Sequence, residues 1–152
     1  NWRSIVRAIL AARGSGRLKT TAGLVSLIEE VTPERVKHLS KIHPATRSFQ
    51  GIRIAINEEL AAITNALPVA FNKLKTGGVV CVISFHSLED RIVKIQFRRV
   101  AGLPVDTSDS TPMQLRDKKA EMFSRRPVVA GEMEQSLNPR SRSAKMRALK
   151  KL

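Results

Sequence analysis

The first third of the chain carries the hydrophobic spacing of short amphipathic helices. In WRSIVRAILAAR (2–13), apolar side chains recur three and four positions apart while Arg3 and Arg7 fall on another face, which predicts a helix. The glycines at 14 and 16 end it. Thr20 or Thr21 is placed to cap a second helix through LVSLIEEV (24–31), which Pro33 stops. We therefore expect a helical subdomain here.

The middle of the chain predicts a long helix and then a buried strand. Residues 45–66 have apolar positions at helical spacing that would face a core, and Pro68 suits the first turn of a further helix through VAFNKL (69–74). The core positions are Phe49, Ile52, Ile56, Leu60 and Ile63. After two glycines, VVCVIS (79–84) is an apolar run without polar alternation, which is typical of a buried parallel strand.

The last third predicts another helix, a loop and two short strands. Ser87 begins a helix through LEDRIVKIQFRRV (88–100), and residues 101–118 are polar and turn-rich, as in a loop or a partly disordered link. Residues 126–130 and 144–149 suit two short strands. A helix, a buried strand, a helix and late strands in this order indicate an α/β fold, the C-terminal portion of an open sheet.

The high positive charge of the chain indicates which class of partner it binds. The formal net charge is +14, and the basic residues gather in four segments, 3–17, 91–99, 118–126 and 140–151. Such a surface favours nucleic acid over acidic lipid or an idle solvated face. The absence of Tyr argues against broad stacking platforms for single strands. No apolar run reaches the roughly 20 residues of a membrane span, so we expect no membrane partner.

The cysteine content and the first residue of the chain each lead to one expectation. Cys81 is the only cysteine, which excludes an intramolecular disulfide and a cysteine-based zinc site, and its place in an apolar strand predicts a buried side chain. The chain begins at Asn1 without an initiator Met, so we expect further sequence upstream.

The stretch SFHSLEDR (84–91) holds the densest candidate chemistry. A nucleophile elbow needs glycines on both sides of its serine, and these are missing. The three histidines show no metal-ligand spacing, so we expect no metal site. Ser87 and Asp90, three positions apart, nearly match the capping-box pattern. Glu89 and Asp90 both lie in the first turn of the predicted helix, where the helix dipole favours carboxylates. His86 lies just beyond the strand's carboxyl end, where open α/β sheets bind ligands, and Ser84 is the last strand residue; each is either pocket-lining or structural.

Four blocks occur in the order found in one known family. They are HPATRSFQGIRIAINEEL (43–60), LKTGG (74–78), VISFHSLEDRIVK (82–94) and NPRSRSAKMRA (138–148). The chain resembles the C-terminal part of the bacterial-type 16S rRNA cytosine-N(4) methyltransferases, over nearly all its length except the variable loop at 101–125. Thr76 departs from the usual Lys-Pro-Gly-Gly, which we take as a neutral turn variant.

The resemblance implies a fold and a reaction. Residues 42–152 would form the C-terminal half of a Rossmann-type class I methyltransferase domain, and residues 1–41 an α-helical insertion subdomain. The implied activity is methylation of a cytosine's exocyclic amine in small-subunit rRNA by S-adenosylmethionine. That family's glycine-rich cofactor loop, ribose-binding acid and amine-holding motif lie upstream of the insertion. We therefore assign no catalytic, cofactor-binding or metal residue here, and expect the chain alone to be inactive.

The resemblance and the charge together suggest where RNA is bound. The candidates for phosphate contact are Arg47, Arg53, Arg140, Arg142 and Lys145. Arg47 could instead form a salt bridge to an acid such as Glu58, and His43 either lines the pocket or caps a helix. Expected partners are small-subunit rRNA and ribosomal proteins or assembly factors, in the bacterial cytoplasm or in a mitochondrial or plastid matrix. The alternative function is a non-catalytic rRNA-binding assembly factor with the same fold.

Overall fold

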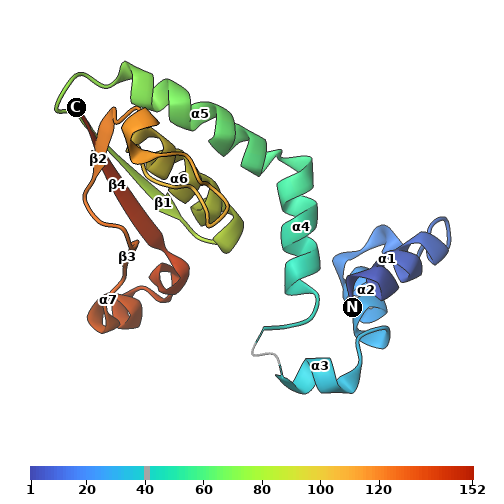
Figure 1. Cartoon of the computed structure of the whole chain (residues 1–152). Helices are drawn as coiled ribbons and strands as arrows, with labels where there is room; N and C mark the ends of the chain where they lie inside the picture. Colours follow the sequence, from blue (N-terminus) through green and yellow to red (C-terminus); the bar gives the residue numbers. More distant parts are fainter. Residues whose placement is uncertain (40–41) are drawn as a thin grey trace. The chain divides into compact units, whose positions relative to one another are not determined.

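The chain divides into two compact units. The computed structural model describes residues 1–39 and 42–152 (Figure 1). The first unit is Asn1–Asn57 and the second is Glu58–Leu152. The sequence placed a division after residue 41, whereas the contacts group residues 42–57 with the helices before them.

The first unit is helical, as the sequence predicts. Its elements are α1 (Trp2–Ala11), a 3₁₀ turn η1 (Arg17–Lys19), α2 (Thr21–Glu30), α3 (Glu34–Leu39) and α4 (Thr46–Ile56). The predicted cap of α2 is confirmed, because the Thr20 hydroxyl accepts a hydrogen bond from the Gly23 N–H at 3.1 Å. Leu27 and Ile28 of α2 are buried and give this small unit its core.

The single long helix predicted for residues 45–66 is wrong. The backbone of Glu58 is left-handed, with φ of 50°, so α4 ends before it and α5 (Glu59–Lys73) begins after it. α5 then continues through Pro68, which the sequence placed at a helix start. The ring costs α5 one backbone hydrogen bond on an exposed stretch. The break also leaves Ile56 75% exposed, against the expectation of a core position.

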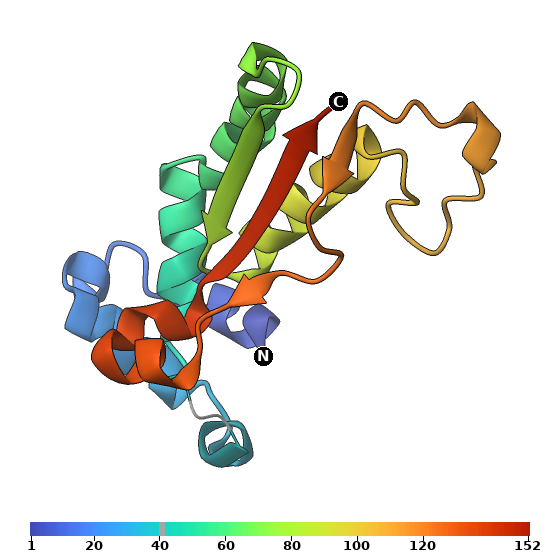
Figure 2. The same ribbon diagram turned by 90° about the vertical axis from the view of Figure 1, so that its left-hand side faces the viewer.

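The second unit is a small sheet with helices on it. Its remaining elements are β1 (Val79–Ser84), α6 (Ser87–Val100), η2 (Met113–Leu115), β2 (Ala120–Met122), β3 (Val128–Val129), α7 (Glu132–Leu137), η3 (Pro139–Ser143) and β4 (Lys145–Lys151). The strand order is β1-β4-β2, with β3 also paired to β4 (Figure 2). The strands predicted at 126–130 and 144–149 are therefore present, whereas β2 and α7 were not anticipated.

The direction of β1 differs from the expectation in one respect. Its hydrogen-bonded neighbour β4 is antiparallel, with Val82 opposite Arg147, although a parallel neighbour was predicted. Because β2 is also antiparallel to β4, β1 and β2 run parallel to each other on either side of it. α6 connects them, so the segment is a βαβ crossover with β4 inserted between its strands.

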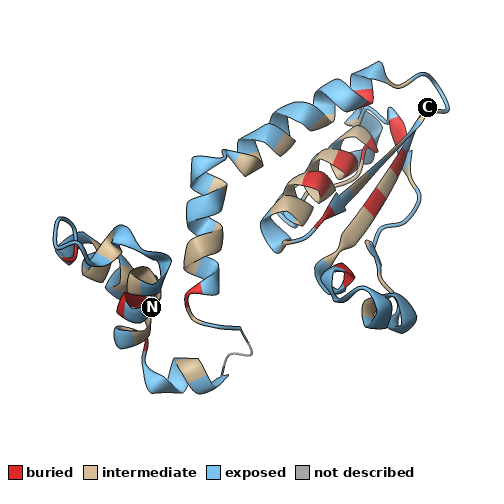
Figure 3. Ribbon diagram, turned by 180° about the vertical axis from the view of Figure 1, so that it is seen from behind, coloured by how far each residue is buried: buried red, intermediate tan, exposed pale blue. Residues whose placement is uncertain are grey.

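The core of this unit lies on one face of the sheet. Phe71 of α5, Val93 and Phe97 of α6, and Leu149 of β4 form one buried cluster (Figure 3). Successive strand residues point to opposite faces, so Val80 and Val82 pack against this cluster. The odd-numbered residues of β1 point away from it.

This alternation corrects the prediction of a wholly buried strand. Val79 and Ile83 are 45% and 57% exposed, and Cys81 is exposed rather than buried. An apolar run without polar alternation indicates burial on both faces, and the described residues bury only one of them.

The loop expected at 101–118 is present and has an internal clasp. The Arg116 guanidinium donates to both carboxylate oxygens of Asp109, at 2.8 and 3.0 Å, and the Val105 N–H donates to the same carboxylate at 2.9 Å. The hydrogen bonds from Arg116 hold the pKa of Asp109 far below its usual range. These hydrogen bonds connect residues of the loop to one another and hold its conformation. Sequence inspection did not anticipate them.

Candidate functional site at the carboxyl end of β1

β1 ends at Ser84, whose side chain joins two strands. The residue is 3% exposed, and its hydroxyl donates to the Lys145 carbonyl of β4 at 3.3 Å. Ser84 therefore helps fix the position at which the chain leaves the sheet. Its role as a pocket-lining residue stays a prediction.

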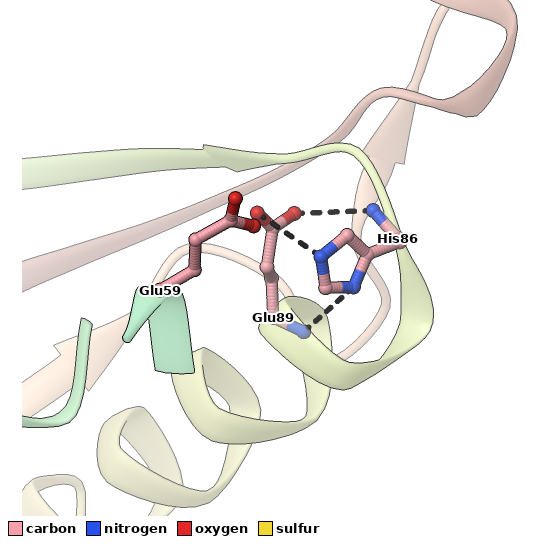
Figure 4. A group of neighbouring side chains, drawn as sticks. All are labelled: Glu59, His86 and Glu89. Carbon is pink, nitrogen blue, oxygen red and sulfur yellow. Dashed lines mark hydrogen bonds and ion pairs between the residues drawn. The ribbon is translucent and has the colours of Figure 1, made fainter. Parts of the chain in front are cut away.

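The residue that caps α6 is His86. Its Nδ1 accepts the Glu89 N–H at 3.3 Å, while Glu89 Oε2 accepts the N–H groups of Phe85 and His86 at 2.8 and 3.1 Å (Figure 4). This is a reciprocal capping box. The box predicted from Ser87 and Asp90 is therefore wrong by one residue, because Ser87 already belongs to the helix.

The hydrogen bond that Nδ1 accepts fixes the tautomer of the neutral His86 imidazole. Since Nδ1 accepts a hydrogen bond, the proton of the neutral ring lies on Nε2. Nε2 is buried and is 3.3 Å from Glu89 Oε1, but the two atoms are not aligned for a hydrogen bond. Nε2 is thus a buried nitrogen held against a carboxylate with its hydrogen-bonding capacity unused.

A third side chain completes this cluster. Glu59, in the first turn of α5, points toward His86 and Glu89 (Figure 4). One ligand atom from each of the three residues lies within 4.8 Å of the others, but the protonated Nε2 of His86 offers no lone pair to a metal ion. Sequence reasoning missed Glu59, because 27 positions separate it from His86 and only the packing of α5 on α6 brings them together.

Asp90 has a different role from the cap that the sequence gave it. Its carboxylate accepts two hydrogen bonds from Arg147 of β4, at 2.7 and 3.1 Å, and the two side chains are only 13% and 5% exposed. The hydrogen bonds from Arg147 lower the pKa of Asp90. Lys145 Nζ lies 3.9 Å from the same carboxylate. The pair anchors α6 to the central strand.

Three basic candidates lie on one short segment of the second unit. Pro139 begins η3, and the Asn138 side chain accepts the Arg140 N–H at 3.3 Å. Arg140 and Arg142 are exposed on this turn, and Lys145 follows at the start of β4 with 41% of its side chain exposed. The turn therefore presents cationic side chains to solvent directly before the central strand.

The candidates of the first unit lie around the start of α4. His43 Nδ1 accepts the Ala45 N–H at 3.2 Å and its Nε2 is 2.9 Å from Glu29 Oε1. His43 also lines an apolar groove, so both of its predicted roles stay predictions. Arg47 is exposed and lines the same groove, of about 870 Å³, with Trp2 also among the lining residues. It forms no ion pair within residues 1–39 and 42–57. Arg53 is exposed on α4.

The capping assignment is testable by substitution. We expect His86→Ala to lower the free energy of unfolding by about 1 kcal/mol, the usual cost of losing a side-chain cap, and Ser87→Ala to change it by less than about 0.5 kcal/mol. Urea denaturation of both variants measures the difference. Equal losses, or a larger loss in Ser87→Ala, would show that the cap lies at residue 87 after all.

Comparison with known proteins decides the family. The sequence model of the MraW methylase family matches residues 1–152, which is the whole chain. The chain belongs to the MraW methylase family. This result confirms the resemblance carried by the four ordered sequence blocks.

Several curated relatives bear the same name, Ribosomal RNA small subunit methyltransferase H. The protein of Methylorubrum extorquens (strain PA1) is 45% identical over 148 residues, which cover 96% of this chain and 42% of that protein. Those of Sinorhizobium fredii and Geobacter sulfurreducens are 46% and 44% identical, covering 95% and 99% of this chain. The chain thus spans less than half the length of these relatives. Among residues 1–39 and 42–152, no helix is both long and apolar enough to cross a membrane.

Proposed function

We propose that this chain forms the C-terminal, rRNA-facing part of an S-adenosylmethionine-dependent methyltransferase. Its substrate would be the exocyclic amine of a cytosine in small-subunit rRNA. The observation that carries the proposal is the match of the whole chain to one methylase family, together with relatives named as small-subunit rRNA methyltransferases.

The sheet supports a place within a larger Rossmann-type domain. β1 pairs only with β4 among the described strands, so its other edge has no partner there. An apolar edge strand such as VVCVI is a site of further strand pairing, and folded proteins avoid leaving one open. A neighbouring strand from further sequence of the domain would cover this edge.

The reaction explains why the chain needs no nucleophile of its own. The lone pair of the cytosine amine is delocalised into the ring, so transfer depends on aligning the amine with the sulfonium methyl group and accepting its hydrogen bonds. The base must also be unpaired or flipped out to be reached. This chain would hold the RNA in place, while the cofactor would bind to the portion of the domain that the relatives have in addition.

The charges of the chain suit an rRNA partner. The net charge is +14, and the exposed cations Arg47, Arg53, Arg140 and Arg142 lie on helix and turn surfaces. Arginine and lysine contacts to phosphate give binding that is strong, largely independent of sequence and sensitive to salt. The bacterial relatives favour the bacterial cytoplasm as the compartment, with rRNA and ribosomal proteins as the macromolecules encountered there.

The basic turn gives a test of RNA contact. We expect Arg140→Ala, Arg142→Ala and Lys145→Ala each to weaken binding to rRNA fragments similarly across sequences, and to reduce the slope of log affinity against log salt by about one unit. Each substitution removes one cation that displaces counterions. Fluorescence anisotropy over a salt series gives the slope.

A matched control separates specific contact from general charge. Lys119 is 61% exposed and is paired with Asp117 away from this turn, so Lys119→Ala should leave the slope nearly unchanged. If all four variants behave alike, the turn has no special part in binding RNA.

A chimera tests the proposed activity itself. Residues 1–152 would replace the matching segment of the Geobacter sulfurreducens relative, and nucleoside mass spectrometry would measure N(4)-methylcytidine in small-subunit rRNA. We expect the chimera to form it. A folded chimera that binds rRNA without methylating it would instead favour the assembly-factor function.

A further inference from the structure

We propose that the apolar groove of the first unit binds an acidic, amphipathic helix that belongs to further sequence of the same polypeptide. The groove has a volume of about 870 Å³ and is lined chiefly by α1 and α4, so we call it the α1–α4 groove. The proposal concerns how the helical unit is completed, and it does not depend on the methyl-transfer function.

The lining residues follow helical spacing on both helices. α1 contributes positions 2, 5, 6 and 9, and α4 contributes positions 47, 48, 51, 52 and 55. Residues three and four positions apart lie on one face of a helix, so each helix presents one continuous stripe to the groove. At 1.5 Å per residue the stripes are about 10 Å long on α1 and about 12 Å long on α4. Two stripes of this length accommodate about two turns of a third helix, as in other proteins that bind a helix in an apolar groove.

The apolar stripes have no cover of their own. Neither α1 nor α4 contains a buried residue (Figure 3). Trp2 and Val6 of α1 are 68% and 44% exposed, and Leu39 and Ile52 across the groove are 77% and 40% exposed. An amphipathic helix normally buries its apolar stripe, and a contiguous exposed apolar surface marks a site of interaction.

The polar groups of the groove argue against a ligand that needs many hydrogen bonds, such as a nucleobase. Asn1 Nδ2 donates to the Thr32 hydroxyl at 3.1 Å, and that hydroxyl donates to the Ile28 carbonyl at 2.6 Å. His43 Nε2 is 2.9 Å from Glu29 Oε1. Sites for small polar ligands present converging polar groups that are free to bind them, whereas these three lining residues already bond within the unit. The groove therefore suits the apolar face of a helix.

The charge of the unit indicates the sign of the occupant. Residues 1–57 contain ten Lys and Arg against three Glu, a formal net charge of +7. Arg47 lies exposed at the groove without an ion pair in the described part of this unit. Carboxylates beside the apolar stripe of the occupant would complement these cations, which is the ion-pair alternative to phosphate contact for Arg47. A second copy of the chain would instead bring the same positive charge and be repelled.

The length of the relatives and the position of Asn1 favour an occupant from the same polypeptide. The match covers 42% of the Methylorubrum extorquens protein, so that protein contains much sequence outside it. Asn1 itself lines the groove, and a segment joined to it would be held there at high effective concentration. A unit of 57 residues is also marginal in stability, and covering its exposed apolar surface would stabilise it.

Gly51 offers a probe inside the groove. A Cβ added at this position meets no neighbouring segment within 4 Å, so Gly51→Cys introduces a thiol without displacing other groups. The variant would also carry Cys81→Ser, and its rate of reaction with a maleimide would be measured by mass spectrometry of the peptide that contains residue 51. We expect the thiol to react at least about tenfold more slowly in the chimera with the Geobacter sulfurreducens relative than in the 152-residue chain, because the helix covers it.

A matched control places the thiol outside the groove. Ser26 is exposed on α2 and does not line the groove, so Ser26→Cys should react at similar rates in the chain and in the chimera. Circular dichroism verifies that the proteins are folded. If the chimera does not fold, peptides that cover the relative's sequence outside the match must slow the reaction at residue 51 when they are added to the 152-residue chain.

A photo-cross-link identifies the occupant. Benzophenone attached to Gly51→Cys in the chimera should cross-link to one segment outside residues 1–152, with apolar residues at helical spacing and flanking Asp or Glu. Equal reactivity of the thiol in chain and chimera would overturn the proposal. Protection that appears only when an rRNA fragment is added would show that RNA occupies the groove, and a cross-link between two molecules would show a second copy there. Either result would also overturn it.

Discussion

Asp90→Ala is expected to lower the free energy of unfolding of the second unit by about 3 kcal/mol. The substitution leaves the guanidinium of Arg147 buried without its carboxylate, and that side chain is only 5% exposed. Removing one partner of a buried pair costs more than the pair itself contributes, because the remaining charge stays desolvated. Urea denaturation followed by circular dichroism measures the loss.

Two variants serve as comparisons for this result. Glu121→Ala removes an exposed carboxylate of β2 and should change stability by less than about 0.5 kcal/mol. Asp90→Ala combined with Arg147→Met replaces both charges by apolar groups, and should recover part of the loss. If Asp90→Ala is as mild as Glu121→Ala, the pair does not anchor α6 to β4.

The same pair gives stability a defined dependence on pH. Arg147 lowers the folded-state pKa of Asp90, so the unfolded chain binds a proton at this group more readily than the folded chain does. The stabilisation is fully present above the ordinary pKa of about 4, and is lost as pH falls through the lowered folded-state pKa. The stability difference between the wild type and Asp90→Ala should therefore be constant near neutrality and shrink below about pH 4.

The chain by itself is expected not to bind S-adenosylmethionine at micromolar concentrations. In Rossmann-type folds the cofactor lies across the carboxyl ends of neighbouring parallel strands, against a glycine-rich turn between a strand and a helix. In the described residues β1 is preceded by helices alone, and its paired neighbour β4 is antiparallel. The contacts that the cofactor needs would come from the additional length of the relatives.

Isothermal titration calorimetry with S-adenosylmethionine tests whether the chain alone binds the cofactor. The 152-residue chain should give no heat of binding, whereas the chimera with the Geobacter sulfurreducens relative should bind the cofactor. Micromolar binding by the chain alone would place a cofactor site within residues 1–152 and contradict the proposed division of the domain.

Local sequence patterns were enough to predict a helix or strand wherever its conformation depends on neighbouring residues alone. The stripe of α1, the Thr20 cap of α2, the strand VVCVIS and the helix after it were all predicted, because periodicity and caps act over a few residues. The four ordered blocks likewise gave the family, since a resemblance needs no coordinates.

Tertiary contacts decided the rest, for a physical reason in each case. Periodicity continues across residues 45–66, and only the left-handed backbone of Glu58 shows that the helix is broken. The capping box lies at His86 and Glu89 because α6 already includes Ser87, and Asp90 pairs instead with Arg147, a partner 57 positions away.

The candidate site shows the same dependence on distant residues. The sequence contains SFHSLEDR, but Glu59 reaches His86 only because α5 packs on α6 in the folded chain. The sequence by itself thus determined the family and those helices and strands that have a clear local pattern, such as α1, α2, β1 and α6. The tertiary structure decided which charges pair, which strand face is covered and which side chains meet, since these depend on contacts between residues far apart in the chain.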